Sequence, residues 1–145
     1  MELIRQFILS FISTVGFSIL YSSPRETLPY AGFVGASGWT VFYISSNILN
    51  SNIGGTFLAA LTVGLLGEVF ARLNKNPATL YITPGIIPLV PGAGMYYTMF
   101  ALVEKDFPLA ADKGTANFFV AASIAIGIIF SSIFSQSITR VRQTD

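Results

Sequence analysis

The residues of this sequence best placed to do chemistry are prolines and glycines, and the chemistry they favour is ligand binding by the backbone. Residues 84–94 hold three prolines and three glycines inside an apolar run over residues 81–103. A proline has no N–H and clashes with the carbonyl four residues earlier, so a helix should break here. Hydrocarbon does not tolerate unpaired backbone groups unless protein or water covers them. We therefore expect a discontinuous helix that is buried in protein or lines a wet cavity, as at the substrate sites of secondary transporters.

The prolines also restrict the residues that precede them. Thr83, Ile87 and Val90 should be pushed out of the α region, because a proline ring clashes with the backbone N–H and Cβ of the preceding residue. The expected arrangement is a short helix, an irregular bend between about Ile86 and Gly92, and a second helix.

The start of that second half-helix is the candidate site for an anionic substrate group. No predicted span has a lysine or arginine near its centre, so backbone N–H groups would have to meet the anion. The positive end of the helix dipole favours an anion, and glycines permit close approach. A purely structural kink is the alternative, since proline and glycine are frequent in membrane helices. The candidate substrate-binding residues are Pro88, Pro91, Gly92, Ala93, Gly94 and Tyr96, the last through its hydroxyl.

Glu68 is the acid that lies well inside an apolar run, and Arg72 follows it by four residues. Ionisable residues within a membrane are costly and are functional candidates by default. The spacing also suits a salt bridge on one helix face, close to the end of the segment. Two interpretations therefore stay open, a structural ion pair and a role in proton coupling or ligand binding.

Several reaction classes are excluded by missing residue types. The chain has no cysteine and no histidine, which removes thiolate chemistry, the commonest general base and the commonest metal ligand. Residues 35–38 (Gly-Ala-Ser-Gly) match the Gly-x-Ser-Gly pattern of rhomboid-type proteases, but no span offers a base to activate the serine. We expect no enzyme activity, no cofactor and no metal site. The glycines and alanine more plausibly form a small-residue face for helix packing, made of Gly32, Gly35, Ala36 and Gly38.

Composition indicates an all-α, polytopic membrane protein. Of the 145 residues, 52% are hydrophobic and 10% are charged, against roughly a quarter charged in soluble domains. A net charge of +1 argues against nucleic acid as a partner. Five apolar runs of about 20 residues predict about five spans in a single transmembrane domain over residues 1–145, with the fourth span broken. The second run is the weakest because of its glycines, and residues 104–114 are expected to be a charged loop. The runs cover residues 3–21, 30–49, 53–73, 81–103 and 115–138.

Lysine and arginine counts in the short loops predict the orientation in the plasma membrane. With five spans, three basic residues lie on one side and five on the other, and the richer side is expected to be cytoplasmic. This places the C-terminus in the cytoplasm. The poorer side holds Arg5, Lys105 and Lys113, and the richer side holds Arg25, Arg72, Lys75, Arg140 and Arg142.

Three stretches, taken in order, carry the motifs of a known family. Residues 35–39 (Gly-Ala-Ser-Gly-Trp) fit a Gly-x-x-Gly-Trp signature, and residues 71–78 fit an Ala-Arg, then Lys-x-Pro-Ala, loop. Residues 85–92 (Gly-Ile-Ile-Pro-Leu-Val-Pro-Gly) are close to the most distinctive motif of the family. The chain thus resembles the threonine/serine exporter family over nearly its whole length. The match is to the small subunit, which corresponds to the C-terminal half of the fused form and is related to a two-subunit succinate exporter.

The resemblance implies transport near Pro88 to Gly92, makes Glu68 and Arg72 family-typical positions, and implies a larger membrane subunit as partner. The leading hypothesis is a subunit of a proton-driven secondary transporter that exports threonine, serine or a dicarboxylate such as succinate. No Walker-type nucleotide motif is present in the sequence. The alternative is a membrane scaffold or assembly subunit that does not transport. Self-assembly through the small-residue faces is a further level of association that the sequence allows.

Overall fold

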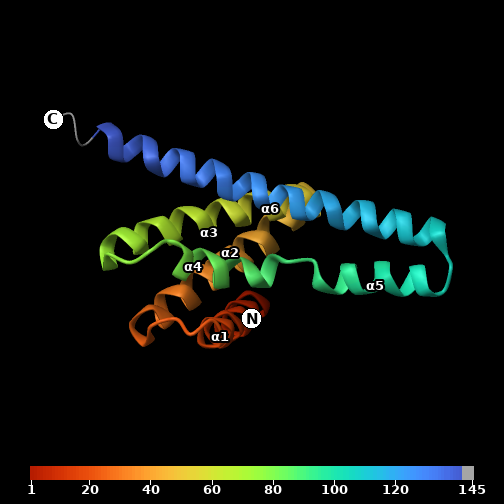
Figure 1. Ribbon diagram of the computed structural model, residues 1–145, viewed down its shortest axis with the longest axis horizontal. Coiled ribbons are helices and arrows are strands. Elements are labelled where there is room, and N and C mark those ends of the chain that lie inside the picture. The colour runs from red at the N-terminus through yellow and green to blue at the C-terminus, as the bar shows by residue number, and fades with distance from the viewer. Residues whose placement is uncertain (142–145) are drawn as a thin grey trace.

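The computed structural model describes residues 1–141, with the side chains of residues 136 and 138–141 left out of the description. All of its regular elements are helical, which confirms the all-α class (Figure 1). Of the basic residues in the charge count, Arg142 and the side chain of Arg140 lie outside this description. The elements are α1 (Glu2–Leu20), η1 (Arg25–Thr27), α2 (Leu28–Leu49), α3 (Asn52–Asn74), α4 (Thr79–Ile86), η2 (Ile87–Leu89), α5 (Gly92–Val103) and α6 (Phe107–Val141).

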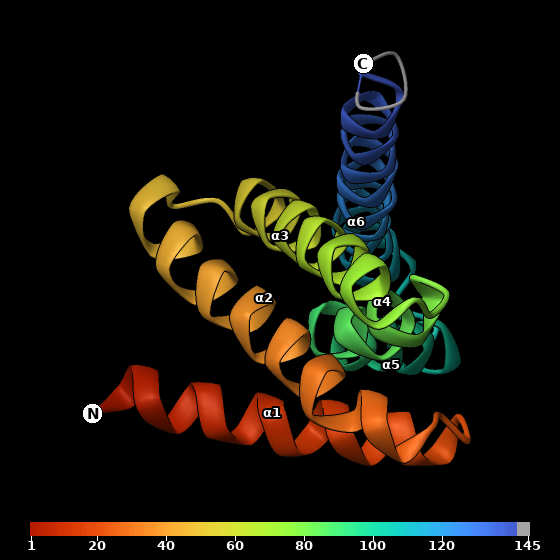
Figure 2. The same ribbon diagram turned by 90° about the vertical axis from the view of Figure 1, so that its left-hand side faces the viewer.

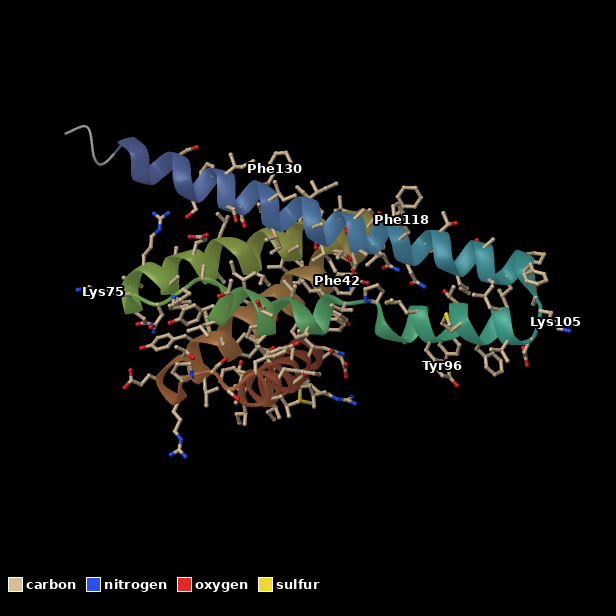
Figure 3. All side chains as sticks on the ribbon, in the orientation of Figure 1. Phe42, Lys75, Tyr96, Lys105, Phe118 and Phe130 are labelled. Carbon is tan, nitrogen blue, oxygen red and sulfur yellow. The ribbon has the colours of Figure 1, made fainter. Side chains whose placement is uncertain are left out.

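The helices pack in a chain of neighbours. α1 packs on α2, α2 on α3, and α3 on α6, while α4 sits against both α2 and α3 (Figure 2). α5 packs on α6, and the two extend together as a hairpin past the other helices (Figure 1). Its tip carries Lys105, whereas Lys75 lies at the opposite end of the molecule (Figure 3).

The polarity of α1 is inverted relative to a helix of a soluble protein. Ser10, Thr14 and Ser18 are spaced four residues apart and are buried against the bundle. Each hydroxyl donates a hydrogen bond to a carbonyl of its own helix, at 2.9 Å from Ser10 to Gln6 O and at 2.8 Å for the other two. The outward face carries large apolar side chains such as Ile8. Such a surface suits lipid or an apolar partner rather than water.

α6 shows the same inversion along its length. Ser123, Ser131 and Ser135 face the bundle and are buried. The first two hydroxyls donate to carbonyls three residues earlier, at 2.7 and 2.8 Å. The exposed face is apolar and includes Phe118 and Phe130, which point away from the bundle in Figure 3. The inverted pattern identifies these helices as membrane helices on grounds other than their length.

The predicted small-residue face of α2 is confirmed. Gly32, Gly35, Ala36 and Gly38 are all buried. A Cβ atom at Gly35 would overlap the side chain of Thr14 on α1, and one at Gly38 would overlap Val63 on α3. The glycines therefore allow α1 and α3 to approach α2 on two sides, as small residues do in membrane helix pairs.

The number of spans that length and composition support is smaller than the expected five. α1, α3 and α6 are each long and apolar enough to cross a membrane, and α4–η2 with α5 would make a fourth span, bent by 53°. α2 has 22 residues and is long enough, but it is not among the helices that are apolar enough to cross a membrane. Its glycines lower its hydropathy, as expected from the sequence, and its serines and asparagine lower it further. The break in the fourth segment is confirmed.

The prediction of a loop over residues 104–114 is wrong from Phe107 onward, where α6 begins. Only Glu104 to Asp106 separate α5 from α6. The Asp106 carboxylate accepts a hydrogen bond from the backbone N–H of Leu109 at 3.1 Å, so it caps the new helix. Pro108 falls in the first turn, where a missing N–H costs nothing. Charges and a proline that are typical of a loop therefore start a helix of 35 residues.

We predict that Gly35→Ala will loosen the contact between α1 and α2. The added methyl group must displace Thr14, and such overpacking costs about 1–3 kcal/mol. The measurement is thermal unfolding of the purified chain in detergent. Gly16→Ala is the matched control, because a Cβ at Gly16 meets nothing within 4 Å, and it should leave the midpoint unchanged or slightly raised. Equal midpoints for the two variants would contradict the packing role of Gly35.

Candidate functional site

The break occupies the five residues between the end of α4 and the start of α5. Ile87–Leu89 form a single 3₁₀ turn, Val90 is extended (φ −64°, ψ 129°), and Pro91 precedes the first residue of α5. Of the three residues that precede prolines, only Val90 leaves the α region as expected. Thr83 stays in α4, and Ile87 keeps φ −53° and ψ −45°. The expectation was wrong at these two positions, because both residues keep helical backbone angles although the ring of the following proline disfavours them.

Two backbone donors at the start of α5 have no partner among the described residues. The N–H of Gly92 donates to Val90 O at 2.8 Å, and that of Met95 donates to Pro91 O at 3.0 Å. No side chain caps the helix. The N–H groups of Ala93 and Gly94 have no acceptor among the described residues. A Cβ atom at Gly92 would meet nothing within 4 Å, so the approach to these donors is open. The predicted anion site therefore has two free donors and an open approach.

A cavity of about 760 Å³ lies beside the break, between the end of α4, α5 and α6. Its polar side chains are Thr98 and Asn117, and Pro91 lines it from the break. The Asn117 amide donates to the Thr98 hydroxyl at 3.0 Å, and that hydroxyl donates to Gly94 O at 2.9 Å. The rest of the lining is apolar apart from one glycine, and consists of Ile86, Val90, Met95, Met99, Gly114, Phe118, Ala121, Ile124, Ala125, Ile128 and Ile129.

The structure separates the predicted substrate-binding residues into three groups. Pro91 lines the large cavity, and Gly92 to Gly94 begin α5 next to it. Pro88 lies on the other side of the break, in a second cavity of about 200 Å³ against α1 and α2. Tyr96 is 65% exposed and points away from α6 (Figure 3). Its ring stacks on Phe100 at 6.3 Å between centroids, so it does not join the cavity.

Glu68 and Arg72 are connected through a third residue rather than by a direct ion pair, which was one of the two interpretations left open. Among the described side chains, no carboxylate oxygen of Glu68 lies within ion-pair distance of Arg72. Ser135 on α6 stands between them instead. Nη2 of Arg72 donates to Ser135 O at 2.6 Å and contacts its hydroxyl at 2.5 Å, and that hydroxyl donates to Oε2 of Glu68 at 3.2 Å. The network ties α3 to α6 and does not line the cavity beside the break.

Two further polar contacts near the break were missed from the sequence. Tyr81 on α4 is fully buried, and its hydroxyl accepts hydrogen bonds from Asn74 at 3.0 Å and Asn76 at 3.4 Å. Trp39 on α2 donates from Nε1 to Oε1 of Gln6 on α1 at 2.9 Å. The asparagines flanking Lys75 were a signal of the first contact. The contact between Trp39 and Gln6 joins residues 33 apart, and no local sequence pattern indicates it.

Comparison with known proteins supplies the identity that these features leave open. No solved structure shows significant similarity to the chain. Residues 6–134 match the family described as Threonine/Serine exporter, ThrE. This match covers most of the chain and confirms the resemblance seen in the motifs. A membrane transporter with a small-molecule substrate also agrees with the inverted polarity and the broken helix. The chain belongs to the Threonine/Serine exporter, ThrE, family.

Proposed function

We propose that the chain is the smaller subunit of a two-component secondary transporter that exports threonine, serine or a dicarboxylate such as succinate. The observation that carries this proposal is the interrupted helix, whose start at Gly92 leaves free backbone donors beside a large cavity. Irregular backbone at membrane depth is tolerated where it lines a cavity. Such a break is the usual place of a substrate site in secondary transporters.

The composition of the cavity wall supports a second, larger membrane subunit. Thr98 and Asn117 already bond to each other, and the rest of the wall is nearly all apolar. A hydrophilic solute needs polar groups around it, because an unpaired buried polar group is costly. This chain offers few, so we infer that a larger subunit of the same family covers the cavity and completes the path. Self-assembly of this chain would have to use a surface other than the glycine face of α2, since α1 and α3 already cover that face.

A substrate carboxylate would bind to the N–H groups of Ala93 and Gly94. The twelve residues of α5 place the positive end of its dipole at this point. The absence of a side chain at Gly92 leaves room for the anion, as at other helix N-termini that bind anions. Pro91 supports the geometry by fixing φ just before the helix begins, and Tyr96 is left out of this site because of its exposure.

The Glu68–Ser135–Arg72 network is the proposed element of proton coupling. Glu68 is half-buried within α3, and its oxygen accepts the Ser135 hydroxyl. Protonation of the carboxylate would weaken that hydrogen bond, because an ionised acceptor bonds more strongly than a neutral one. The link between α3 and α6 would then respond to protons. In the alternative, the network has a structural role only and holds α3 against α6.

We further propose that the protein lies in the plasma membrane as one transmembrane domain with its C-terminus in the cytoplasm. Lys75 and Lys105 at opposite ends of the molecule support the separation of charges on which this orientation depends (Figure 3). The proposed mechanism involves no cofactor, metal or nucleic acid.

Gly92→Val should weaken substrate binding and leave the fold intact. Loss of hydrogen bonds to a charged group costs about 1.5–3 kcal/mol, or about 10- to 150-fold in affinity. The measurement is the substrate concentration for half-maximal export by the assembled complex in liposomes. Gly16→Val is the matched control, because that glycine is equally open but lies on α1. Substrate should also slow thiol labelling of an Ala93→Cys variant. Normal export by Gly92→Val together with unprotected labelling would place the carboxylate site elsewhere.

Glu68→Gln should distinguish a role in proton coupling from a purely structural link between α3 and α6. Glutamine keeps the size of the side chain and accepts the Ser135 hydroxyl, so expression should persist. Export driven by a proton gradient should disappear, while exchange of labelled for unlabelled substrate should continue. Glu26→Gln changes an acid in η1, outside the helices that form the network, and should behave as wild type. Full proton-driven export by Glu68→Gln would end the coupling role.

The isolated chain should not transport, because its cavity lacks the wall that we assign to the larger subunit. The test compares substrate flux into liposomes with this chain alone and with both subunits, at equal protein amounts. Flux should require both. Transport by this chain alone would remove the need for a partner, and no flux from the assembled pair would favour a scaffold function.

A further inference from the structure

The break has a second face, and a separate cavity lies on it. This cavity of about 200 Å³ is formed by α1, α2 and η2, and does not share any lining residue with the larger cavity beside α5. Its lining residues are Gln6, Leu9, Ser10, Ser13, Trp39 and Pro88.

This pocket is richer in hydrogen-bonding side chains than the larger cavity. Gln6 is held in one orientation, because the indole N–H of Trp39 can only donate and therefore faces Oε1 of the amide at 2.9 Å. The amide NH₂ of Gln6 is left to donate, and no described residue accepts from it. Ser10 donates to carbonyls of its own helix and keeps its oxygen lone pairs as acceptors. Ser13 is exposed and adds a hydroxyl that can turn to donate or accept.

No charged side chain lines this pocket, which decides the kind of group it can hold. A carboxylate or ammonium group would find no counter-charge among these side chains, which disfavours its burial against them. A neutral hydroxyl can accept from the Gln6 amide and donate to the oxygen of Ser10. The ring of Pro88 and the side chain of Leu9 supply apolar surface beside these groups. Such a combination suits a small side chain that carries a hydroxyl, with or without a methyl group.

The pocket also joins two motifs that lie far apart in the sequence. Trp39 ends the Gly-x-x-Gly-Trp stretch on α2, and Pro88 belongs to the Pro-Leu-Val-Pro-Gly stretch that forms the break. α1 completes the pocket by contributing Gln6 to the Trp39 indole. The proline therefore both interrupts the helix and forms part of the pocket wall.

We propose that the Gln6–Ser13–Trp39 pocket on the α1 side of the break is a binding site for the hydroxyl-bearing side chain of a small solute, such as that of threonine or serine. The site is distinct from the backbone donors at the start of α5. The inference rests on the proposed function, because it takes the break as the place where substrate meets this chain. It adds a basis for selecting hydroxyl groups that the backbone donors cannot provide.

The sole tryptophan of the chain reports on this pocket. The experiment titrates the full chain, reconstituted in liposomes, with L-threonine, L-serine, L-valine and succinate, and follows tryptophan emission. Valine has nearly the shape of threonine but lacks its hydroxyl, and a site built for a hydroxyl rejects such an analogue strongly. Threonine and serine should change the emission saturably, and valine and succinate should not. Equal responses to threonine and valine, or no response to threonine, would overturn the proposal.

Two variants assign the response to the pocket. Gln6→Leu should abolish the threonine-dependent change. Ser13→Ala alters an exposed side chain, so it should not affect folding, and it should weaken threonine binding about two- to tenfold, as expected for one hydrogen bond. Ser137→Ala on α6 is the matched control and should bind like wild type, because Ser137 is exposed and its hydroxyl bonds within its own helix at 3.0 Å. A threonine response unchanged in Ser13→Ala and Gln6→Leu would refute the site.

The result is independent of the proposed transport site. If substrate protects the Ala93→Cys variant from labelling and tryptophan emission does not respond, the hydroxyl pocket is refuted while the proposed function stands. If emission responds and neither labelling nor flux does, the pocket stands and the export function of the break fails.

Discussion

Buried serine and threonine side chains, with one exception among the described residues, hydrogen-bond to a nearby carbonyl along the chain. Of the buried serines and threonines that the structure describes, all except Ser135 donate to a carbonyl three or four residues earlier. This local pairing lets small polar residues face inward, so that large apolar residues can face outward. At two of the glycines that allow close packing, Gly35 on α2 and Gly64 on α3, the facing side chain is one of these hydroxyl residues, Thr14 or Ser131. The constraint is the one that hydrocarbon imposes, since no polar group can be left unpaired in it.

The break between α4 and α5 is the place where this rule is relaxed. Ala93 and Gly94 keep N–H groups that no described residue accepts, and Val90 is extended between two prolines. The two faces of the break differ in chemistry, with a large and mostly apolar cavity toward α6 and a small pocket with four hydrogen-bonding side chains toward α1. Ser135 is the other departure, because its hydroxyl bonds to Glu68 on a different helix. Both departures involve residues that we connect with transport.

The sequence predicted those features that covalent chemistry dictates locally. Pro88 and Pro91 cannot donate to a helix, so the interruption near them followed directly. The absence of a side chain at Gly35 and Gly38 likewise indicated close packing, although not which helix would fill the space. Contacts between distant residues could not be predicted, as for Ser135, which lies 63 residues from Arg72. The start of α6 was missed because Asp106 and Pro108 are equally typical of a loop and of a helix beginning, and the choice depends on packing against α5.

The length of α6 means that a small tilt of this helix would move the ends of the α5–α6 hairpin over a long distance. At about 1.5 Å per residue, its 35 residues reach about 52 Å, well beyond a hydrocarbon layer of about 30 Å. Asp112 and Lys113 mark where its apolar stretch begins, so the first two turns project into the headgroups or beyond. α5 packs on this helix and is joined to α4 only through the short break. A tilt of α6 about its contact with Arg72 would therefore also move the start of α5. Even a small change in angle there would widen or narrow the cavity that Pro91 lines.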